Sequence, residues 1–243
     1  SDSTMFGNRI TELRKKIASE LGFAIPPVRI TDNLNLKPAE YSIRIRDVEA
    51  ARASVRADKL VAIADGPVSD KVLRNLGEEF NEPVYGKKAC WISAEERENA
   101  RDKGCIVTDI PSLIIVHMEE IIRRNAADLL DRQTVQSMLD ELSKRHPAAV
   151  KETMKLLTLI DIHKVLRNLL KEQVSIRDLG LILETLGDSV SVSGDIGYLT
   201  EETRRGLRRQ IPHSYADEGM HLHVITLSSE TEKKLLENPY DIR

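Results

Sequence analysis

The stretch at residues 81–93, NEPVYGKKACWIS, begins with a bend and ends in a strand. Pro83 biases the preceding Glu82 towards an extended backbone. Gly86 permits backbone angles that a residue with a side chain would resist. Tyr85 stands inside this bend, and an aromatic side chain beside charged residues at a loop–strand junction is typical of a protein-docking spot. We therefore expect the bend to present Tyr85 and Glu82 to a partner.

The second half of the stretch, residues 89–92, alternates as a strand with two different faces. Cys90 and Ile92 share one face, and Ala89 and Trp91 share the other. Trp91 is the only tryptophan of a chain in which aromatic residues make up 4%. Because large aromatic side chains contribute strongly to a core, we expect Trp91 to anchor the unit that surrounds it.

Elements on both sides of this strand predict a compact α/β unit over residues 59–109. In chain order the pattern indicates strand 59–64, helix 69–80, strand 89–92, helix 94–104 and strand 105–109. Ser93 and Glu96 form a capping-box pattern at the start of the second helix. Cys90 and Cys105 could form a disulfide, but we favour two buried free thiols on neighbouring strands.

The remainder of the chain predicts an extended N-terminal region followed by helices. Before the unit, helix 9–21 ends at Gly22, an extended segment follows, and residues 41–48 alternate as a strand. After it, helices are expected at 111–130, 133–145, 160–172, 176–186 and 201–211; the pattern Ser175-x-x-Asp178 caps the fourth of these, with Ser175 as the first residue, and Thr200 caps the fifth. Residues 130–210 therefore form a helical domain. A strand at 220–227 and a helix at 228–238 indicate the start of another α/β unit, which the chain leaves truncated.

The composition excludes some classes of partner. With 36 basic and 39 acidic residues, the net charge of −3 gives no electrostatic basis for binding nucleic acid or a membrane surface. No apolar run is long enough for a transmembrane helix, and no signal peptide is visible. The first residue is not methionine, so we expect a piece of a longer protein. Two cysteines suit a reducing compartment.

The side chains that usually perform catalysis do not form a recognisable site. Phosphate-binding glycine loops, nucleophile elbows and zinc-binding helix motifs are absent from the sequence. His221 and His223 could bind a metal from one strand face, but no third ligand is near, so a solvated face is the better interpretation. We expect His117 to be partly buried and hydrogen-bonded rather than a general base. Cys90 has no evident His or Asp partner in the sequence that would make it a nucleophile. We expect no catalytic residue, no metal site, no cofactor and no enzymatic activity.

A basic run at residues 204–210, RRGLRRQ, is the densest positive segment. A solvated helix face is the simpler interpretation of it. The alternative is a contact with an acidic protein or with a neighbouring subunit.

The order of motifs resembles the cytoplasmic domain of the export-gate family of type III secretion, in its flagellar branch. The resemblance is carried by LGFAIPPVRITDNLNLKPAEYSIRI at 21–45, EPVYGKKACWI at 82–92, ADLLDRQTVQSMLDEL at 127–142 and HKVLRNLLKEQVSIRDLGLILETL at 163–186. The virulence-associated injectisome homologues form the other branch, and they remain the nearest alternative.

The resemblance implies a fold of α/β and helical subdomains. By analogy, residues 1–58 and 110–129 form a first α/β subdomain, and residues 59–109 form a small inserted α/β subdomain. Residues 130–210 form the helical third subdomain, and residues 211–243 begin a truncated α/β fourth. The membrane domain of the family precedes this region and is absent here.

The resemblance also implies a function in protein export without enzymatic activity. Family members form a ring of nine on the cytoplasmic face of the bacterial inner membrane. They bind flagellar export chaperones with their cargo, export substrates and other soluble export components. We expect this chain to be such a docking platform. A purely structural ring component without a cargo site is the alternative from another class.

The family places its chaperone-docking dimple between the first two subdomains, at a D-P-V-F-G motif and at a helix position before a histidine. Here the motif is EPVYG, so the implied binding residues are Glu82, Pro83, Tyr85 and Gly86, together with Val116 before His117. Glutamate and tyrosine keep the charge and the ring, whereas Val116 replaces the usual threonine and removes a hydroxyl. Val72 and Leu113 are the expected apolar rim residues. Lysines at 87–88 replace an apolar pattern and could alter partner preference.

Overall fold

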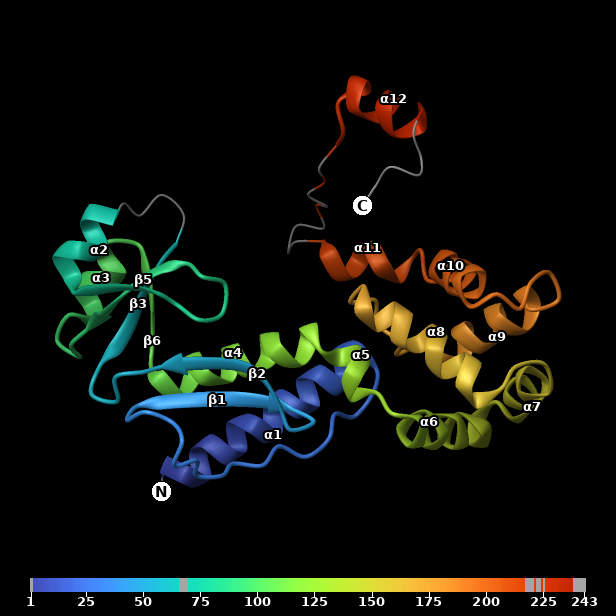
Figure 1. The fold of residues 1–243 in the computed structure, drawn as a ribbon, viewed down its shortest axis with the longest axis horizontal. Coiled ribbons are helices and arrows are strands. Elements are labelled where there is room, and N and C mark those ends of the chain that lie inside the picture. Colours follow the sequence, from blue (N-terminus) through green and yellow to red (C-terminus); the bar gives the residue numbers. More distant parts are fainter. Residues whose placement is uncertain (1, 66–69, 217–220, 222–223, 225, 238–243) are drawn as a thin grey trace.

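The computed structural model describes residues 2–65, 70–216, 221, 224 and 226–237. In this part of the chain the fold is mixed α/β, with two small sheets and helices around and beyond them. Figure 1 shows the four-stranded sheet at one end, the two-stranded sheet with two long helices in the middle, and a group of helices at the other end. No helix among these residues is both long and apolar enough to cross a membrane.

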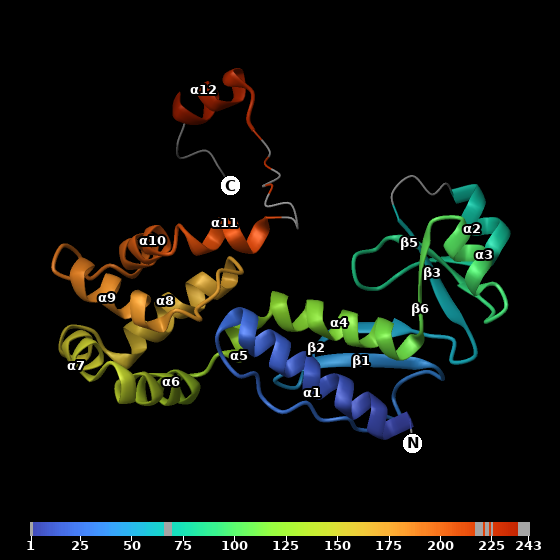
Figure 2. The same ribbon diagram turned by 180° about the vertical axis from the view of Figure 1, so that it is seen from behind.

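The middle of the molecule is formed by two long helices and a hairpin. Helix α1 (Asp2–Leu21) packs against α4 (Ile110–Arg124), and strands β1 (Glu40–Ile45) and β2 (Val48–Ser54) lie alongside them in both views (Figures 1 and 2). The prediction of one strand over 41–48 was wrong, because the chain turns at Arg46. This residue and the next have φ of 48° and 65°, which is the backbone of a type I′ hairpin turn.

The four-stranded sheet is antiparallel throughout. Its order is β4 (Glu78–Asn81), β5 (Lys88–Ile92), β3 (Leu60–Ala64) and β6 (Cys105–Thr108). Helices α2 (Asp70–Leu76) and α3 (Arg97–Asp102) cover the face that carries Cys90 and Ile92. The start of α4 covers the opposite face, which carries Ala89 and Trp91. The predicted alternation of these four residues is confirmed.

The helix predicted over 69–80 ends at Leu76, and its last residues form β4 instead. Gly77 lies between the two elements, and only glycine fits there, because a Cβ would lie 2.0 Å from the carbonyl oxygen of Trp91. Phe80 therefore lies in a strand, where its ring stacks on Trp91 with centroids 4.2 Å apart. The indole is buried in the core that α4 completes, so the anchoring role predicted for Trp91 is confirmed.

Two further predictions in this unit need correction. The capping box at Ser93 does not form; α3 starts after Glu96, whose side chain makes no capping hydrogen bond. Both cysteines are buried free thiols, as expected. They do not lie on neighbouring strands, however, because Cys90 on β5 and Cys105 on β6 flank β3 from opposite sides.

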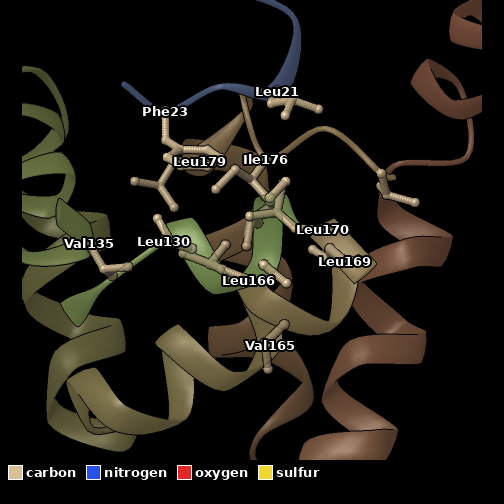
Figure 3. Close-up of a cluster of buried hydrophobic side chains, with 14 of the residues drawn as sticks. Leu21, Phe23, Leu130, Val135, Val165, Leu166, Leu169, Leu170, Ile176 and Leu179 are labelled. Carbon is tan, nitrogen blue, oxygen red and sulfur yellow. The ribbon is translucent and has the colours of Figure 1, made fainter. Parts of the chain in front are cut away.

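The second half of the described chain is helical. Its helices are α5 (Ala126–Leu129), α6 (Arg132–Arg145), α7 (Pro147–Leu156), α8 (Leu159–Lys171), α9 (Leu179–Ser189), α10 (Ile196–Gly206) and α11 (Gln210–Tyr215). Helix α8 is central, and its apolar face is almost fully buried, as its spacing predicts (Figure 3). That face consists of Ile162, Val165, Leu166, Leu169 and Leu170.

The caps of these helices differ from the expected ones. Asp178 alone caps α9, through a hydrogen bond from the N–H of Leu181, whereas Ser175 lies before the helix. Asp195 caps α10, and Thr200 is buried inside that helix, where its hydroxyl donates to the carbonyl of the preceding turn. The helix predicted over 111–130 is divided at Asn125 into α4 and α5.

The end of α1 belongs to the same core as the helical half. Figure 3 shows Leu21 and Phe23 beside Ile176 and Leu179. The N–H of Ile176 donates to the carbonyl oxygen of Leu21 at 2.9 Å, and the Ser175 hydroxyl donates to the preceding carbonyl at 2.6 Å. The carbonyl groups left free at the end of α1 are thus satisfied by a segment 155 residues further along the chain.

The C-terminal region is described only in part. Residues 221, 224, 226 and 227 are not in a strand, and the rest of the strand predicted over 220–227 lies outside the described residues. Helix α12 (Ser229–Glu237) agrees with the helix predicted over 228–238.

Candidate functional site

The bend at residues 82–87 is the connection between β4 and β5. The N–H of Glu82 donates to the carbonyl of Lys87 at 2.9 Å, and the N–H of Gly86 donates to the carbonyl of Glu82 at 3.1 Å. Gly86 has a φ of +70°, which favours glycine because a Cβ would be strained there. The bend is therefore a closed turn with a defined backbone.

The carboxylate of Glu82 holds this turn from inside. It accepts hydrogen bonds from the N–H groups of Val84 at 2.6 Å, Tyr85 at 3.0 Å and Lys87 at 3.0 Å. Only 2% of the Glu82 residue is exposed. The expectation that its side chain is presented to a partner is wrong, because the carboxylate faces the backbone of its own turn. A buried charge needs several donors, and the turn supplies them.

The side chain of Tyr85 points away from the turn and is 62% exposed. Its neighbour Val84 is buried instead, in the core that contains Trp91 and Leu113. Tyr85 thus stands on a backbone fixed both by the Glu82 carboxylate and by an apolar anchor. The buried position of Val84 was not predicted from the sequence, although an apolar residue between Pro83 and an aromatic residue is a signal for such an anchor.

Helix α4 packs against the turn that carries Tyr85, because Leu113 shares a core with Val84. Partial burial raises the pKa of Tyr85 above its ordinary value, and the negative charges of Glu120 and Glu119 on α4 raise it further. Val116, one turn before Glu120, is 43% exposed. Tyr85 is thus an exposed aromatic side chain on the turn, and Val116 is an exposed aliphatic side chain on α4, which packs against the turn. We call these two residues the docking surface, after the role that the sequence predicts for them.

The two expected rim residues lie elsewhere. Leu113 is 2% exposed and belongs to the core beneath the bend, so it supports the site from below. Val72 is on α2, where it packs against the core on the far face of the four-stranded sheet. The structure does not bring Val72 to the bend, because the sheet separates α2 from α4. Pro83 is half-buried within the turn.

A buried histidine on α4 and a half-buried tyrosine on β1 contact each other. The hydroxyl of Tyr41 on β1 and Nδ1 of His117 on α4 are 2.7 Å apart, and the two rings meet edge to face. Burial lowers the pKa of His117, although the charge of Glu82 opposes the change. Burial and the same charge raise the pKa of Tyr41. The predicted hydrogen-bonded role of His117 is confirmed, and the residue, expected to be partly buried, is only 3% exposed; its partner Tyr41 was not foreseen.

The side chains with potential for catalysis are in structural positions. Burial raises the pKa of Cys90 to about 11, which leaves its thiol protonated in the core. No group of three or more metal-binding side chains occurs among the described residues. His223, one of the two candidate metal ligands, lies outside them.

The basic run at 204–210 is partly neutralised by acidic neighbours. Arg204 pairs with Glu172 at 2.7 Å and with Glu201, while Arg205 pairs with Glu202 at 2.7 Å. These contacts agree with the simpler interpretation of this half of the run as a solvated helix face.

Comparison with known proteins gives matches over nearly the whole chain. A family model described as the FHIPEP family matches residues 1–241. The flagellar biosynthesis protein FlhA of Treponema pallidum is 42% identical over 232 residues, which cover 95% of this chain and 32% of that protein. FlhA of Borreliella burgdorferi is 38% identical over 231 residues, covering 95% of this chain and 33% of that protein. The chain thus spans about a third of the length of these relatives.

Solved structures share the fold. The Chlamydia pneumoniae CdsV protein, in its complex with CdsO, superposes with a TM-score of 0.81 at 23% identity and covers 95% of this chain and 67% of that one. The nonameric EscV cytosolic domain from the type III secretion system superposes with a TM-score of 0.73 at 20% identity, covering 97% and 69%.

Proposed function

The chain belongs to the FHIPEP family, and we propose that it is a docking platform of the flagellar type III protein export apparatus. In this proposal the docking surface, Tyr85 and Val116, binds complexes of export chaperones with their cargo. The observation that carries the proposal is the 62% exposure of Tyr85 on a turn whose backbone is fixed from inside by a buried carboxylate.

An exposed tyrosine on a rigid support is well suited to bind a protein. Its large ring adds apolar contact area, and only two side-chain torsions must be fixed on binding. Val116 extends the apolar area, while Glu119 is already paired with Lys16 at 2.8 Å and with Arg123. A paired carboxylate offers little net charge to a partner. We therefore expect apolar burial around Tyr85 to supply most of the affinity.

The proposal assigns Glu82 a positioning role. Its carboxylate is 2% exposed and occupied by backbone donors, so it acts through the shape of the turn. Pro83 and Gly86 contribute in the same way, the first by a fixed backbone angle and the second by its positive φ. Leu113 supports the turn from beneath, and Val72 has no part in the site.

We also propose that the chain assembles with copies of itself. The EscV structure is described as nonameric, and the CdsV structure is described as a complex with CdsO. We propose that this chain likewise works within a homo-oligomeric ring on the cytoplasmic side of the bacterial inner membrane and meets other soluble export components there. A ring would raise a modest affinity of each docking surface through multivalency. The flagellar branch is favoured over the injectisome branch because the curated relatives at 38–42% identity are flagellar biosynthesis proteins.

The division into subdomains at 1–58 with 110–129, 59–109, 130–210 and 211–243 is part of the same proposal. In this arrangement the docking surface lies at the boundary between the first two, since Val116 is on α4 and Tyr85 is on the β4–β5 connection. No catalytic residue, metal or cofactor is assigned.

Binding of an export chaperone–cargo complex from the same bacterium, measured by calorimetry, tests the proposal. Tyr85→Ala should weaken binding about tenfold or more, and Val116→Ala should weaken it by a smaller factor. Ile106→Ala is the matched control, because this residue is 50% exposed on β6 of the same sheet. Undiminished affinity in Tyr85→Ala, or an equal loss in Ile106→Ala, would exclude the docking surface.

A further inference from the structure

We propose that Tyr41 and His117 form a positioning pair that fixes the β4–β5 turn in the geometry required for docking. The inference rests on the proposed function, and it assigns a task to a buried histidine and a half-buried tyrosine that the docking surface itself does not use. Neither residue is presented to a partner, since His117 is 3% exposed and Tyr41 is largely covered.

The pair joins two elements that are 76 residues apart in sequence. The Tyr41 hydroxyl on β1 lies 2.7 Å from Nδ1 of His117 on α4. The ring centroids are 5.8 Å apart with an interplanar angle of 79°, so the rings also meet edge to face. A hydrogen bond and a ring contact between the same two residues leave little freedom for either side chain.

Helix α4 carries this constraint towards the turn. Leu113 and His117 are four residues apart and therefore lie on the same face of the helix. Leu113 packs in the core that contains Val84 of the turn, and His117 contacts Tyr41 of the hairpin. One face of α4 thus contacts the turn and the two-stranded sheet at successive positions. A shift of the hairpin relative to α4 would therefore disturb the helix against which Val84 of the turn packs.

Besides burial, the charge of the buried Glu82 carboxylate raises the pKa of Tyr41, and it opposes the lowering of the pKa of His117. Glu82 in turn accepts the N–H groups of Val84, Tyr85 and Lys87. The contacts that the pair can act through therefore run from the hairpin to α4, and from Leu113 of α4 to Val84 of the turn from which Tyr85 projects. If the Tyr41 hydroxyl is removed, Nδ1 of the buried His117 loses its partner, and α4 is held less firmly against the hairpin.

Amide hydrogen exchange, followed by NMR without any partner present, tests the inference. Tyr41→Phe removes only the hydroxyl and keeps the ring. We expect the N–H groups of Val84, Tyr85 and Lys87 to exchange about tenfold faster or more in this variant, because an unpaired buried group weakens the local structure by about that factor. Amides of α8 should exchange as in the parent. Tyr198→Phe is the matched control: Tyr198 is half-buried on α10, and its hydroxyl makes no hydrogen bond within the described residues.

Two variants at the other member of the pair separate positioning from general stability. Asparagine can place a hydrogen-bonding atom near Nδ1 of histidine, whereas leucine cannot. His117→Asn should therefore keep the three amides more protected than His117→Leu does. The inference is overturned if Tyr41→Phe leaves these amides unchanged, or if the two His117 variants lose protection equally. Because no chaperone is used, these outcomes are independent of whether Tyr85 binds one.

Discussion

The N–H of Ile176 donates a hydrogen bond of 2.9 Å to the carbonyl oxygen of Leu21, and this bond joins the end of α1 to the loop before α9. The next residue, Gly22, has a φ of +93° and lies so close to the loop that an added Cβ would be 2.3 Å from the backbone nitrogen of Arg177. The first helix and the helical half therefore meet at a point where only glycine fits.

Replacing Gly22 by alanine should destabilise the whole described fold. The positive φ and the clash with Arg177 together should lower the free energy of unfolding by at least about 2 kcal/mol. Urea unfolding followed by circular dichroism measures this. Gly7→Ala is the matched control, because Gly7 lies inside α1 and a Cβ there meets no atom within 4 Å. That variant should gain up to about 1 kcal/mol from helix propensity. Equal effects of the two substitutions would contradict the close approach.

Replacing Glu82 by glutamine should loosen the turn. The amide keeps one oxygen but loses the charge that strengthens the hydrogen bonds from Val84, Tyr85 and Lys87. We expect a loss of about 1–3 kcal/mol in the free energy of unfolding, together with weaker binding to a chaperone–cargo complex. Glu78→Gln, on exposed β4, removes only a surface pair with Arg56 and should cost about 0–1 kcal/mol. A fully stable Glu82→Gln protein would show that the carboxylate does not hold the turn.

Stability should depend on pH through His117. Burial lowers the pKa of His117 below its ordinary 6.5, so the unfolded chain binds the proton more readily than the folded chain. The ring contacts Tyr41, and the charges of Glu82, Glu120 and Arg124 act on its pKa. This contribution to stability is fully present above pH 6.5 and is lost as the pH falls below that value towards the lower, folded-state pKa. Urea unfolding at pH 7.5 and 5.5 should show a smaller difference in His117→Asn than in the parent. An identical difference would exclude His117 as its source.

The two thiols should resist modification in the folded protein. Burial raises the pKa of Cys90 to about 11 and also raises that of Cys105, so little thiolate exists at pH 8. A thiol-reactive disulfide dye should label both residues quickly in denaturant and slowly in buffer. Cys90→Ser should lower the free energy of unfolding by about 1–3 kcal/mol, because it places a hydroxyl in an apolar core. Rapid labelling of Cys90 in buffer would contradict its place in that core.

Elements whose apolar spacing matches their burial could be predicted from the sequence. The inward face of α8 follows directly from the positions of Leu166 and its neighbours, and Trp91 lies on the predicted face of β5. Strand β2 was missed because its turn uses Arg46 and Asp47 at positive φ, where asparagine and glycine are usual. Strand β4 was missed because Phe80 continues the helical spacing of α2. The close approach of Gly77 to the carbonyl oxygen of Trp91, which marks the boundary between the two elements, is visible only in the folded structure.

The candidate site could likewise be predicted from the sequence only in part. Proline and glycine at 83 and 86 predicted the bend, and the exposed Tyr85 within it could be anticipated. The direction of the Glu82 carboxylate could not, because it depends on which backbone N–H groups the turn aims inward. The contact between Tyr41 and His117 joins elements 76 residues apart, a relationship that local spacing does not contain. Val72 was placed at the site by its position in the family resemblance, although a sheet separates it from the bend.

The hydrogen bonds of Glu82 have a consequence for how such a surface can evolve. They are made to main-chain N–H groups, which nineteen of the twenty amino acids possess. The identity of residue 85 therefore does not enter the scaffold of the turn, whereas residue 82 does. Mutation at position 85 can change the chemistry offered to a partner while the turn keeps its shape. The recognition surface and its support are thus encoded at separate positions, so that one can diverge while the other is retained.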